Sequence, residues 1–106
     1  KDDLALWQEA GRLNPNDSFP LYNLATAQVR VGKLSVACRS FREVTRLNPR
    51  DDMGYAGLGF CAESHGELEN AMRFYEQALS LNPQNDYAAR ARSRLETFDP
   101  EEVMIP

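Results

Sequence analysis

An all-α fold, a solenoid built from antiparallel helix pairs, is the fold class that the sequence predicts. The tripeptide Leu-Asn-Pro recurs at an interval of 34 residues and ends at Pro15, Pro49 and Pro83. A constant period of this length is the signature of a repeat architecture. Within each unit, apolar residues follow one another at steps of three and four positions, which is the spacing of one helix face. A helix pair too small to bury its apolar face alone must then stack on its neighbours.

Residues of the same type or size stand 34 positions apart throughout the chain. Trp7, Phe41 and Tyr75 form an aromatic series at this interval. The other matched positions are Ala10, Val44 and Ala78, Leu24 and Leu58, Ala25 and Gly59, Gly32 and Gly66, Leu34 and Leu68, and Ala37 and Ala71. So many coincidences at one interval are not chance, and they define the repeating unit.

Each unit is predicted to contain two helices. Asp17, Asp51 and Asn85 follow the prolines and can accept hydrogen bonds from the free N–H groups at a helix start. Gly32 and Gly66 stand where the first helix ends and the chain turns. The proline ends the second helix, because it has no N–H to donate and restricts the preceding residue. The predicted helices cover residues 2–13, 18–31, 34–47, 52–65, 68–81 and 86–97.

The second full unit resembles the tetratricopeptide repeat family, whose unit combines large aromatic, Leu-Gly, Ala and Pro positions at fixed spacing. The matching residues are Tyr55, Leu58, Gly59, Ala71, Tyr75, Ala78 and Pro83. The first unit matches at Leu21, Leu24, Ala25, Ala37, Phe41, Val44 and Pro49. It departs from the family at Leu21, where Trp is usual, at Gln28 and its counterpart Ala62, where Tyr is frequent, and at Val44, which replaces Ala. The resemblance covers residues 1–97 and implies a right-handed superhelix with a concave and a convex side.

The predicted domain spans residues 1–97 and has atypical ends. It comprises a partial repeat at 1–17, full repeats at 18–51 and 52–85, and a capping helix at 86–97. Arg92 occupies the position of Leu24 and Leu58, and an unpaired charge there is costly to bury, so nothing is expected to pack beyond this helix. Residues 98–106 are expected to form an extended or disordered tail. A sharper hypothesis places Val103–Ile105 of this tail in an apolar groove of this or a neighbouring molecule.

Composition and charge limit the partners and the location. The net charge of −4 argues against nucleic acid, because such binding depends on neutralising phosphates. No apolar run approaches the roughly 18 residues of a membrane-spanning helix, so membrane insertion is not expected. Cys38 and Cys61 lack the spacing of a disulfide framework or zinc site, and are expected to be reduced, small core residues. Reduced cysteines and the lack of a signal segment favour the cytoplasm. The start at Lys1, without Met, suggests an excised fragment.

The sequence predicts no catalytic residue, no metal ligand and no cofactor. His65, the only histidine, lies four residues after Cys61, so one helix face could present a thiolate–imidazole pair or half of a metal site. However, Cys61 is expected in a small buried position, and His65 lies next to the turn at Gly66. The segment Gly57-Leu58-Gly59 is not preceded by the strand of a phosphate-binding loop, and Gly59 is expected to allow close helix packing.

The family resemblance implies a concave groove lined by the first helix of each pair. Mapping its positions gives Phe19, Tyr22, Asn23, Thr26 and Val29, then Met53, Ala56, Gly57, Phe60 and Glu63, then Tyr87, Arg90 and Arg94. The partner-binding residues predicted from this set are Phe19, Tyr22, Asn23, Thr26, Met53, Phe60, Tyr87 and Arg90. The alternative is that the apolar ones merely fill gaps between helices. A clamp for chaperone carboxyl termini is not expected, because Met53 and Gly57 replace the required Lys and Arg.

The predicted function is that of a non-catalytic scaffold that binds an extended peptide or a helix of a protein partner. The alternative function is a targeting or substrate-recognition module of a larger enzyme, such as a glycosyltransferase with repeats of this kind. The first helix has no hairpin partner, so Leu4, Leu6 and part of Trp7 are expected to be bare. Either the protein continues upstream of this edge, or two copies self-associate through it.

Overall fold

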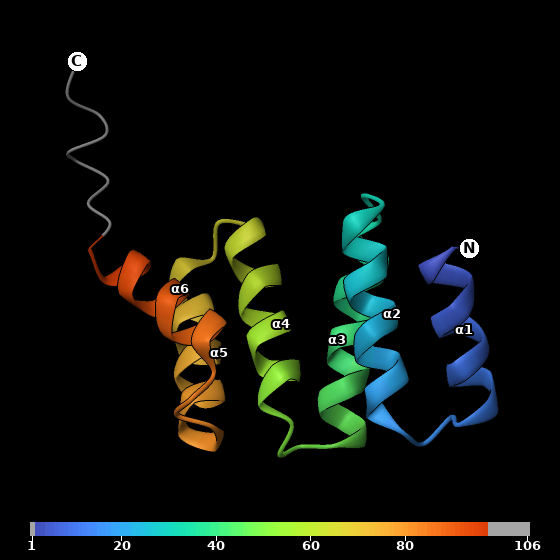
Figure 1. Ribbon diagram of the computed structural model, residues 1–106. Coiled ribbons are helices and arrows are strands. Elements are labelled where there is room, and N and C mark those ends of the chain that lie inside the picture. Colours follow the sequence, from blue (N-terminus) through green and yellow to red (C-terminus); the bar gives the residue numbers. More distant parts are fainter. Residues whose placement is uncertain (1, 98–106) are drawn as a thin grey trace.

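The computed structural model describes residues 2–97, and its regular secondary structure over these residues is entirely helical (Figure 1). The helices are α1 (Asp3–Leu13), α2 (Ser18–Arg30), α3 (Leu34–Leu47), α4 (Asp52–Ser64), α5 (Leu68–Leu81) and α6 (Asp86–Glu96). Each observed bound lies within one residue of its prediction. The expected tail at 98–106, including the Val103–Ile105 hypothesis, falls outside the described residues.

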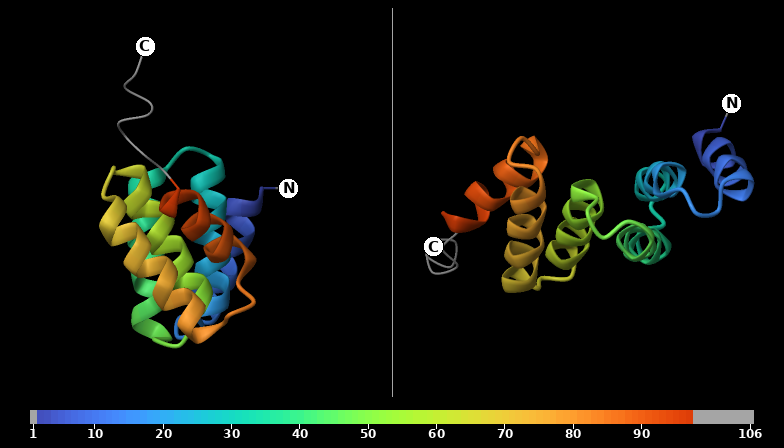
Figure 2. Two further views of the ribbon diagram at one scale, coloured as in Figure 1. Left: turned by 90° about the vertical axis from the view of Figure 1, so that its left-hand side faces the viewer. Right: turned by 90° about the horizontal axis from the view of Figure 1, so that it is seen from below.

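The helices follow one another in chain order along an elongated body of 52 × 29 × 19 Å. The right-hand view of Figure 2 shows this order, with α1 (blue) at one end and α6 (orange to red) at the other. Each helix packs mainly against its neighbours in sequence, and α4 also contacts α6. The interfaces within the pairs α2–α3 and α4–α5 are larger than the α3–α4 interface between pairs. The α3–α4 boundary is therefore the more weakly packed junction in the middle of the array.

The predicted N-cap residues are the observed ones. The Asp17 carboxylate accepts a hydrogen bond from Phe19 N at 3.0 Å, and the Asp51 carboxylate accepts one from Met53 N at 3.0 Å. Asn85 Oδ1 accepts from Ala88 N at 2.9 Å. Each cap satisfies a backbone donor that has no partner within the helix, which fixes where the first helix of each pair begins.

Glycine makes the turn inside each helix pair possible. Gly32 and Gly66 have φ values of +83° and +76°, a region that side chains with a Cβ rarely adopt. Past each glycine the chain closes back on the helix, with Lys33 N donating to Gln28 O at 2.8 Å and Glu67 N donating to Ala62 O at 2.9 Å. These bonds are those of a Schellman C-cap, and they reverse the chain into α3 and α5.

The repeated asparagine has a role that the sequence pattern alone did not reveal. Asn48 Oδ1 accepts a hydrogen bond from Arg50 N at 3.1 Å, and Asn82 Oδ1 accepts one from Gln84 N at 3.0 Å. Their backbone carbonyls also accept from the next N-cap residues, Asp51 and Asn85. The side chain thus closes a local turn around the proline, so the Leu-Asn-Pro recurrence encodes both the helix end and the next helix start.

Small residues on α4 receive large rings from the helices on both sides. A Cβ placed on Gly59 would lie 2.4 Å from the Tyr75 ring of α5, and one on Gly57 would lie 2.3 Å from the Phe41 ring of α3. Tyr75 is fully buried, and Phe41 is only 4% exposed. The predicted close packing at Gly59 is therefore present, and a second close contact occurs at Gly57.

The aromatic series occupies equivalent places one repeat apart. The Trp7 ring lies edge-on to Phe19 at a centroid distance of 5.8 Å, and the Tyr75 ring lies edge-on to Tyr87 at 5.9 Å. In both pairs the partner is 12 residues further along and comes from the next helix. Met53 holds the same relation to Phe41, and the two residues line one cavity. The 34-residue period in the sequence is thus a period in packing.

The first helix is the most exposed of the six, since none of its residues is buried. The Leu6 side chain is 56% exposed, as expected for a helix with a single neighbour, whereas Leu4 and Trp7 are partly covered. At the other end, Arg92 of α6 lies half-buried, with its Nε 3.9 Å from a Glu96 carboxylate oxygen. Arg92 thus has its nearest counter-charge on its own helix.

The expectation that Cys38 and Cys61 are reduced and separate is wrong. The two residues form a disulfide that joins α3 to α4, with their Cα atoms 5.9 Å apart. Their separation of 23 positions in sequence carries no signal, because only the stacking of one pair on the next brings them together. The disulfide also removes the reason for favouring the cytoplasm, since such bonds persist mainly in oxidising compartments.

Alanine at Gly59 should destabilise the protein, and alanine at Gly11 should not. Gly59→Ala places a methyl group into the Tyr75 ring, so we expect a loss of about 1–3 kcal/mol despite the better helix propensity of alanine. Nothing lies within 4 Å of a Cβ on Gly11 in α1, so Gly11→Ala should be neutral or stabilise by up to about 1 kcal/mol. Urea denaturation measures both. Equal stability of the two variants would contradict the close α4–α5 contact.

Candidate functional site

An apolar cavity of about 210 Å³ opens between the two helix pairs and the last helix. Four helices contribute to it: α2, α3, α4 and α6. Its lining residues are Tyr22, Thr26, Val29, Phe41, Met53, Ala56, Gly57, Phe60 and Tyr87. Thr26 Oγ1 donates to Tyr22 O at 3.1 Å, so the hydroxyl proton of Thr26 is used within its own helix. We call this set of residues the apolar groove.

Five of the eight predicted partner-binding residues come together in the apolar groove. They are Tyr22, Thr26, Met53, Phe60 and Tyr87. Val29, Ala56 and Gly57, which the family mapping also placed there, complete most of the remaining wall. Met53 and Tyr87 are 39% and 46% exposed, so a ligand could cover both. Whether these residues bind a partner stays a prediction.

The other three predicted residues lie outside this cavity. Phe19 is 63% exposed and packs edge-on to Trp7, toward the first helix. Asn23 turns its amide back to its own helix, because Nδ2 donates to Phe19 O at 3.0 Å. Arg90 pairs with Asp86 one turn earlier at 3.0 Å, on a largely solvated surface. These three residues lie on the same helices as the groove residues, but they do not line the cavity.

Phe41 is the groove residue that the sequence mapping missed, because it belongs to a second helix and was assigned to the core. Its ring is buried against Tyr22 at a centroid distance of 5.8 Å. Gly57 has no side chain to cover the ring, so one part of Phe41 reaches the cavity. The signal that could have revealed it is the pairing of a glycine on one helix with an aromatic residue on the preceding one.

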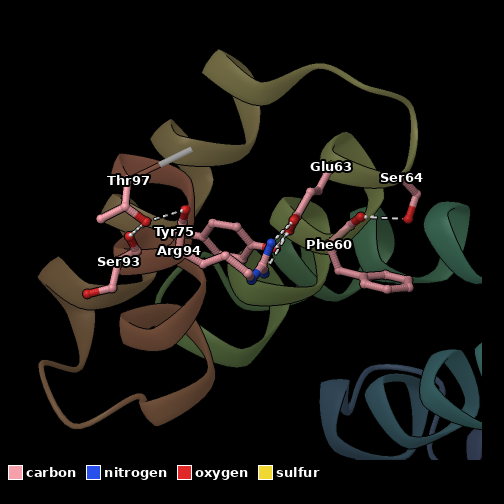
Figure 3. A network of polar contacts seen from close by, with 7 residues as sticks. All are labelled: Phe60, Glu63, Ser64, Tyr75, Ser93, Arg94 and Thr97. Carbon is pink, nitrogen blue, oxygen red and sulfur yellow. Dashed lines mark hydrogen bonds and ion pairs between the residues drawn. The ribbon is translucent and has the colours of Figure 1, made fainter. Parts of the chain in front are cut away.

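A polar cavity adjoins the apolar groove and shares Phe60 and Tyr87 with it. Here Arg94 of α6 forms an ion pair with Glu63 of α4, and Tyr75 Oη donates to Glu63 Oε1 at 2.8 Å (Figure 3). The hydrogen bond from Arg94, assisted by the one from Tyr75, lowers the pKa of Glu63 below its ordinary value of 4.5. The charge of Arg94 is thereby compensated before any ligand arrives.

Burial raises the pKa of two tyrosines in this region, Tyr22 and Tyr75. For Tyr22 the main cause is removal of the hydroxyl from water beside the groove. For Tyr75 the main cause is also burial, and the proximity of Tyr87 and the Glu63 carboxylate adds to it. Both side chains are therefore neutral hydrogen-bonding groups at neutral pH. The groove offers apolar contact area rather than charge.

The described residues do not assemble the thiolate–imidazole pair that the sequence left open. The sulfur of Cys61 is bonded to Cys38, and His65 Nδ1 lies 2.8 Å from the Cys61 backbone oxygen. Within residues 2–97, no group of three or more His, Cys, Asp or Glu side chains is placed to hold a metal ion. None of the six helices is long and apolar enough to cross a bilayer.

Stacked antiparallel helix pairs with a lateral groove define the class of α-solenoid repeat proteins. Residues 53–85 match the family model described as tetratricopeptide repeat. Residues 53–85 are therefore a tetratricopeptide repeat, and the described part of the chain has the fold of solved tetratricopeptide repeat domains. No curated protein is significantly similar to it in sequence.

Solved tetratricopeptide repeat domains have the same fold. The Arabidopsis OM64 domain is 25% identical, with a TM-score of 0.80 over 88% of this chain and 77% of that one. The first domain of Spaghetti (RPAP3), bound to the HSP90 peptide SRMEEVD, is 22% identical, with a TM-score of 0.78 over 96% and 78%. The second domain of human RPAP3, in complex with the HSP70 peptide SGPTIEEVD, is 19% identical, with a TM-score of 0.76 over 90% and 79%.

Removing the charge of Glu63 should change how stability depends on pH. Because the folded-state pKa lies below 4.5, ionised Glu63 stabilises the fold above pH 4.5, and the effect is lost as pH falls through the lowered value. We expect Glu63→Gln to cost about 1 kcal/mol at pH 7. The gap to the wild type should close toward pH 3 in urea denaturation. Glu76→Gln on the exposed side of α5 is the control; a gap that stays constant with pH would contradict the assignment.

Proposed function

We propose that this protein is a non-catalytic interaction scaffold that binds an extended segment of a partner protein in the apolar groove. The observation that carries this proposal is the cavity itself, in which the first helices of both full repeats and α6 face one another across an apolar floor. Two solved structures of the same fold hold peptides, which supports peptide binding as a use of this fold.

The groove favours apolar side chains over acidic ones. Its wall residues carry no charge, and the neighbouring Arg94 is already paired with Glu63. A peptide carboxylate placed here would lose water without gaining a free cation, which is costly. The peptides held by the two RPAP3 domains end in Glu-Glu-Val-Asp, so this chain should select a different class of sequence.

The expected affinity is modest. A partner side chain that covers one exposed wall residue removes on the order of 100 Å² from water, worth about 2–3 kcal/mol. Three such contacts, at Met53, Phe60 and Tyr87, reach roughly 6–9 kcal/mol before the cost of association. An association cost of at least about 4 kcal/mol leaves no more than about 5 kcal/mol from these contacts. Hydrogen bonds to the peptide backbone must add about 1–2 kcal/mol to reach the expected Kd of roughly 10–100 µM, because 1 µM corresponds to about −8.2 kcal/mol. Weak, reversible recognition of an extended peptide is the predicted regime.

Binding can be tested with two labelled peptides and fluorescence anisotropy. The first has three Leu or Phe residues at alternate positions among Ser and Gly, with an amidated end; the second is SRMEEVD. The first should bind in the stated range and the second at least tenfold more weakly. Phe60→Ala should weaken the first by roughly tenfold, about 1.4 kcal/mol.

Leu13→Ala provides the matched control, since Leu13 is 62% exposed and lies outside the groove. This variant should bind like the wild type. Preference for SRMEEVD, or apolar binding that survives simultaneous alanine replacement of Tyr22, Met53 and Phe60, would refute the proposal. Circular dichroism of each variant separates loss of binding from loss of fold.

A further inference from the structure

The disulfide lies at the junction that also carries the apolar groove. Cys38 is three residues before Phe41 on α3, and Cys61 is four residues after Gly57 on α4. Each cysteine is therefore about one helical turn from the Phe41–Gly57 contact that forms the groove floor. Because the α3–α4 interface is smaller than the interfaces within the pairs, this bond is a substantial part of what fixes the distance between the two helices.

A second cavity reaches the disulfide without involving the groove. It has a volume of about 250 Å³ and shares no lining residue with the apolar groove. Its walls are Cys38, Arg42, Leu58, Cys61, Ala62, His65, Glu67 and Phe74. The space is several times the roughly 30 Å³ share of one water molecule, so a thiol group can enter it. We call this cavity the outer pocket.

The charges around the outer pocket suit thiol chemistry. Arg42 lines it, and its side chain is exposed at the rim together with His65. A nearby cation stabilises a thiolate, and a leaving thiol of lower pKa departs faster in disulfide exchange. Glu67 is the acidic group among the lining residues, and its negative charge disfavours a thiolate. The sulfur atoms themselves are well covered, with Cys38 and Cys61 at 4% and 6% exposure, so access is through this opening.

We propose that the Cys38–Cys61 bond is a site of thiol–disulfide exchange, reached through the outer pocket by a dithiol reductant, and that it controls the shape of the apolar groove. A reductant thiolate attacks one sulfur and forms a mixed disulfide, and the other cysteine leaves as a thiolate and takes up a proton. The second reductant thiol then displaces the remaining cysteine. Two electrons and two protons pass to the protein, and the reductant becomes a disulfide.

The consequence for the groove follows from packing. Two unbonded sulfur atoms cannot lie as close as two bonded ones, so reduction moves the Cys38 and Cys61 side chains apart and removes the covalent restraint that holds α3 to α4. The ring of Phe41 then loses its tight contact over Gly57, because interiors are close-packed and transmit such shifts. The oxidised protein has the defined groove, and the reduced protein has a looser one.

The test compares oxidised protein, protein reduced with dithiothreitol, and the double variant Cys38→Ala/Cys61→Ala. Amide spectra should show shifts on reduction at Phe41, Gly57 and Phe60 and little change in α6. Thermal unfolding of the reduced form should occur roughly 15 °C lower, as expected for opening a loop of this length. Dithiothreitol should have no effect on the double variant, which controls for the reagent.

Affinity for the amidated apolar peptide should fall roughly tenfold on reduction, a measurement that rests on the proposed function. Equal affinity in both states would overturn groove control and leave peptide binding intact. If no state binds the peptide, the proposed function fails, and the amide shifts at Phe41 and Gly57 alone decide the inference. A disulfide that resists 10 mM dithiothreitol in the folded protein, or unchanged shifts, would overturn it. Complete loss of helicity on reduction would also overturn the inference, because the disulfide would then stabilise the whole fold rather than control the groove.

Discussion

The close approach of α4 to the rings on either side of it is the constraint on which the rest of this structure depends. Gly57 admits Phe41 from α3 and Gly59 admits Tyr75 from α5, so one helix without bulky side chains at two positions joins both repeats. A helix pair cannot bury its own apolar face, and this interlocking lets each pair be covered by the next. The groove is a by-product, because the missing side chain at Gly57 leaves Phe41 reachable.

Polar contacts set the register of the stacking. Asp52 at the start of α4 accepts hydrogen bonds from Asn82 at 3.1 Å and from Asn85 at 2.7 Å. Ser18 at the start of α2 donates to Asp51 at 3.3 Å, an equivalent link one repeat earlier. The N-cap residues Asp51 and Asn85 thus also contact the preceding first helix. Apolar packing supplies the stabilisation, and these contacts align the helix starts, which keeps the groove residues of successive repeats side by side.

The groove differs in chemistry from a site for charged ligands. Its walls are apolar, and the arginine next to them is neutralised by Glu63, which is held in place by Tyr75 (Figure 3). A compensated arginine can orient a peptide backbone but contributes little net attraction for a carboxylate. The fold is shared with domains that hold the peptides SRMEEVD and SGPTIEEVD, and it is the side chains placed on this common scaffold that decide what a groove can bind.

The sequence by itself determined the helices and their order, because their ends are encoded locally: Asp17, Asp51 and Asn85 cap the starts, and Gly32 and Gly66 make the turns. The family resemblance then placed most residues of the cavity wall, since equivalent positions of successive repeats face the same side of a regular superhelix. Tertiary structure alone decided the rest. Phe41 reaches the groove only because α4 crosses it at a glycine, and Asn23 and Arg90 are occupied by partners on their own helix. Cys38 and Cys61 meet only when one repeat stacks on the next, and their spacing in sequence does not predict that they lie close together in space.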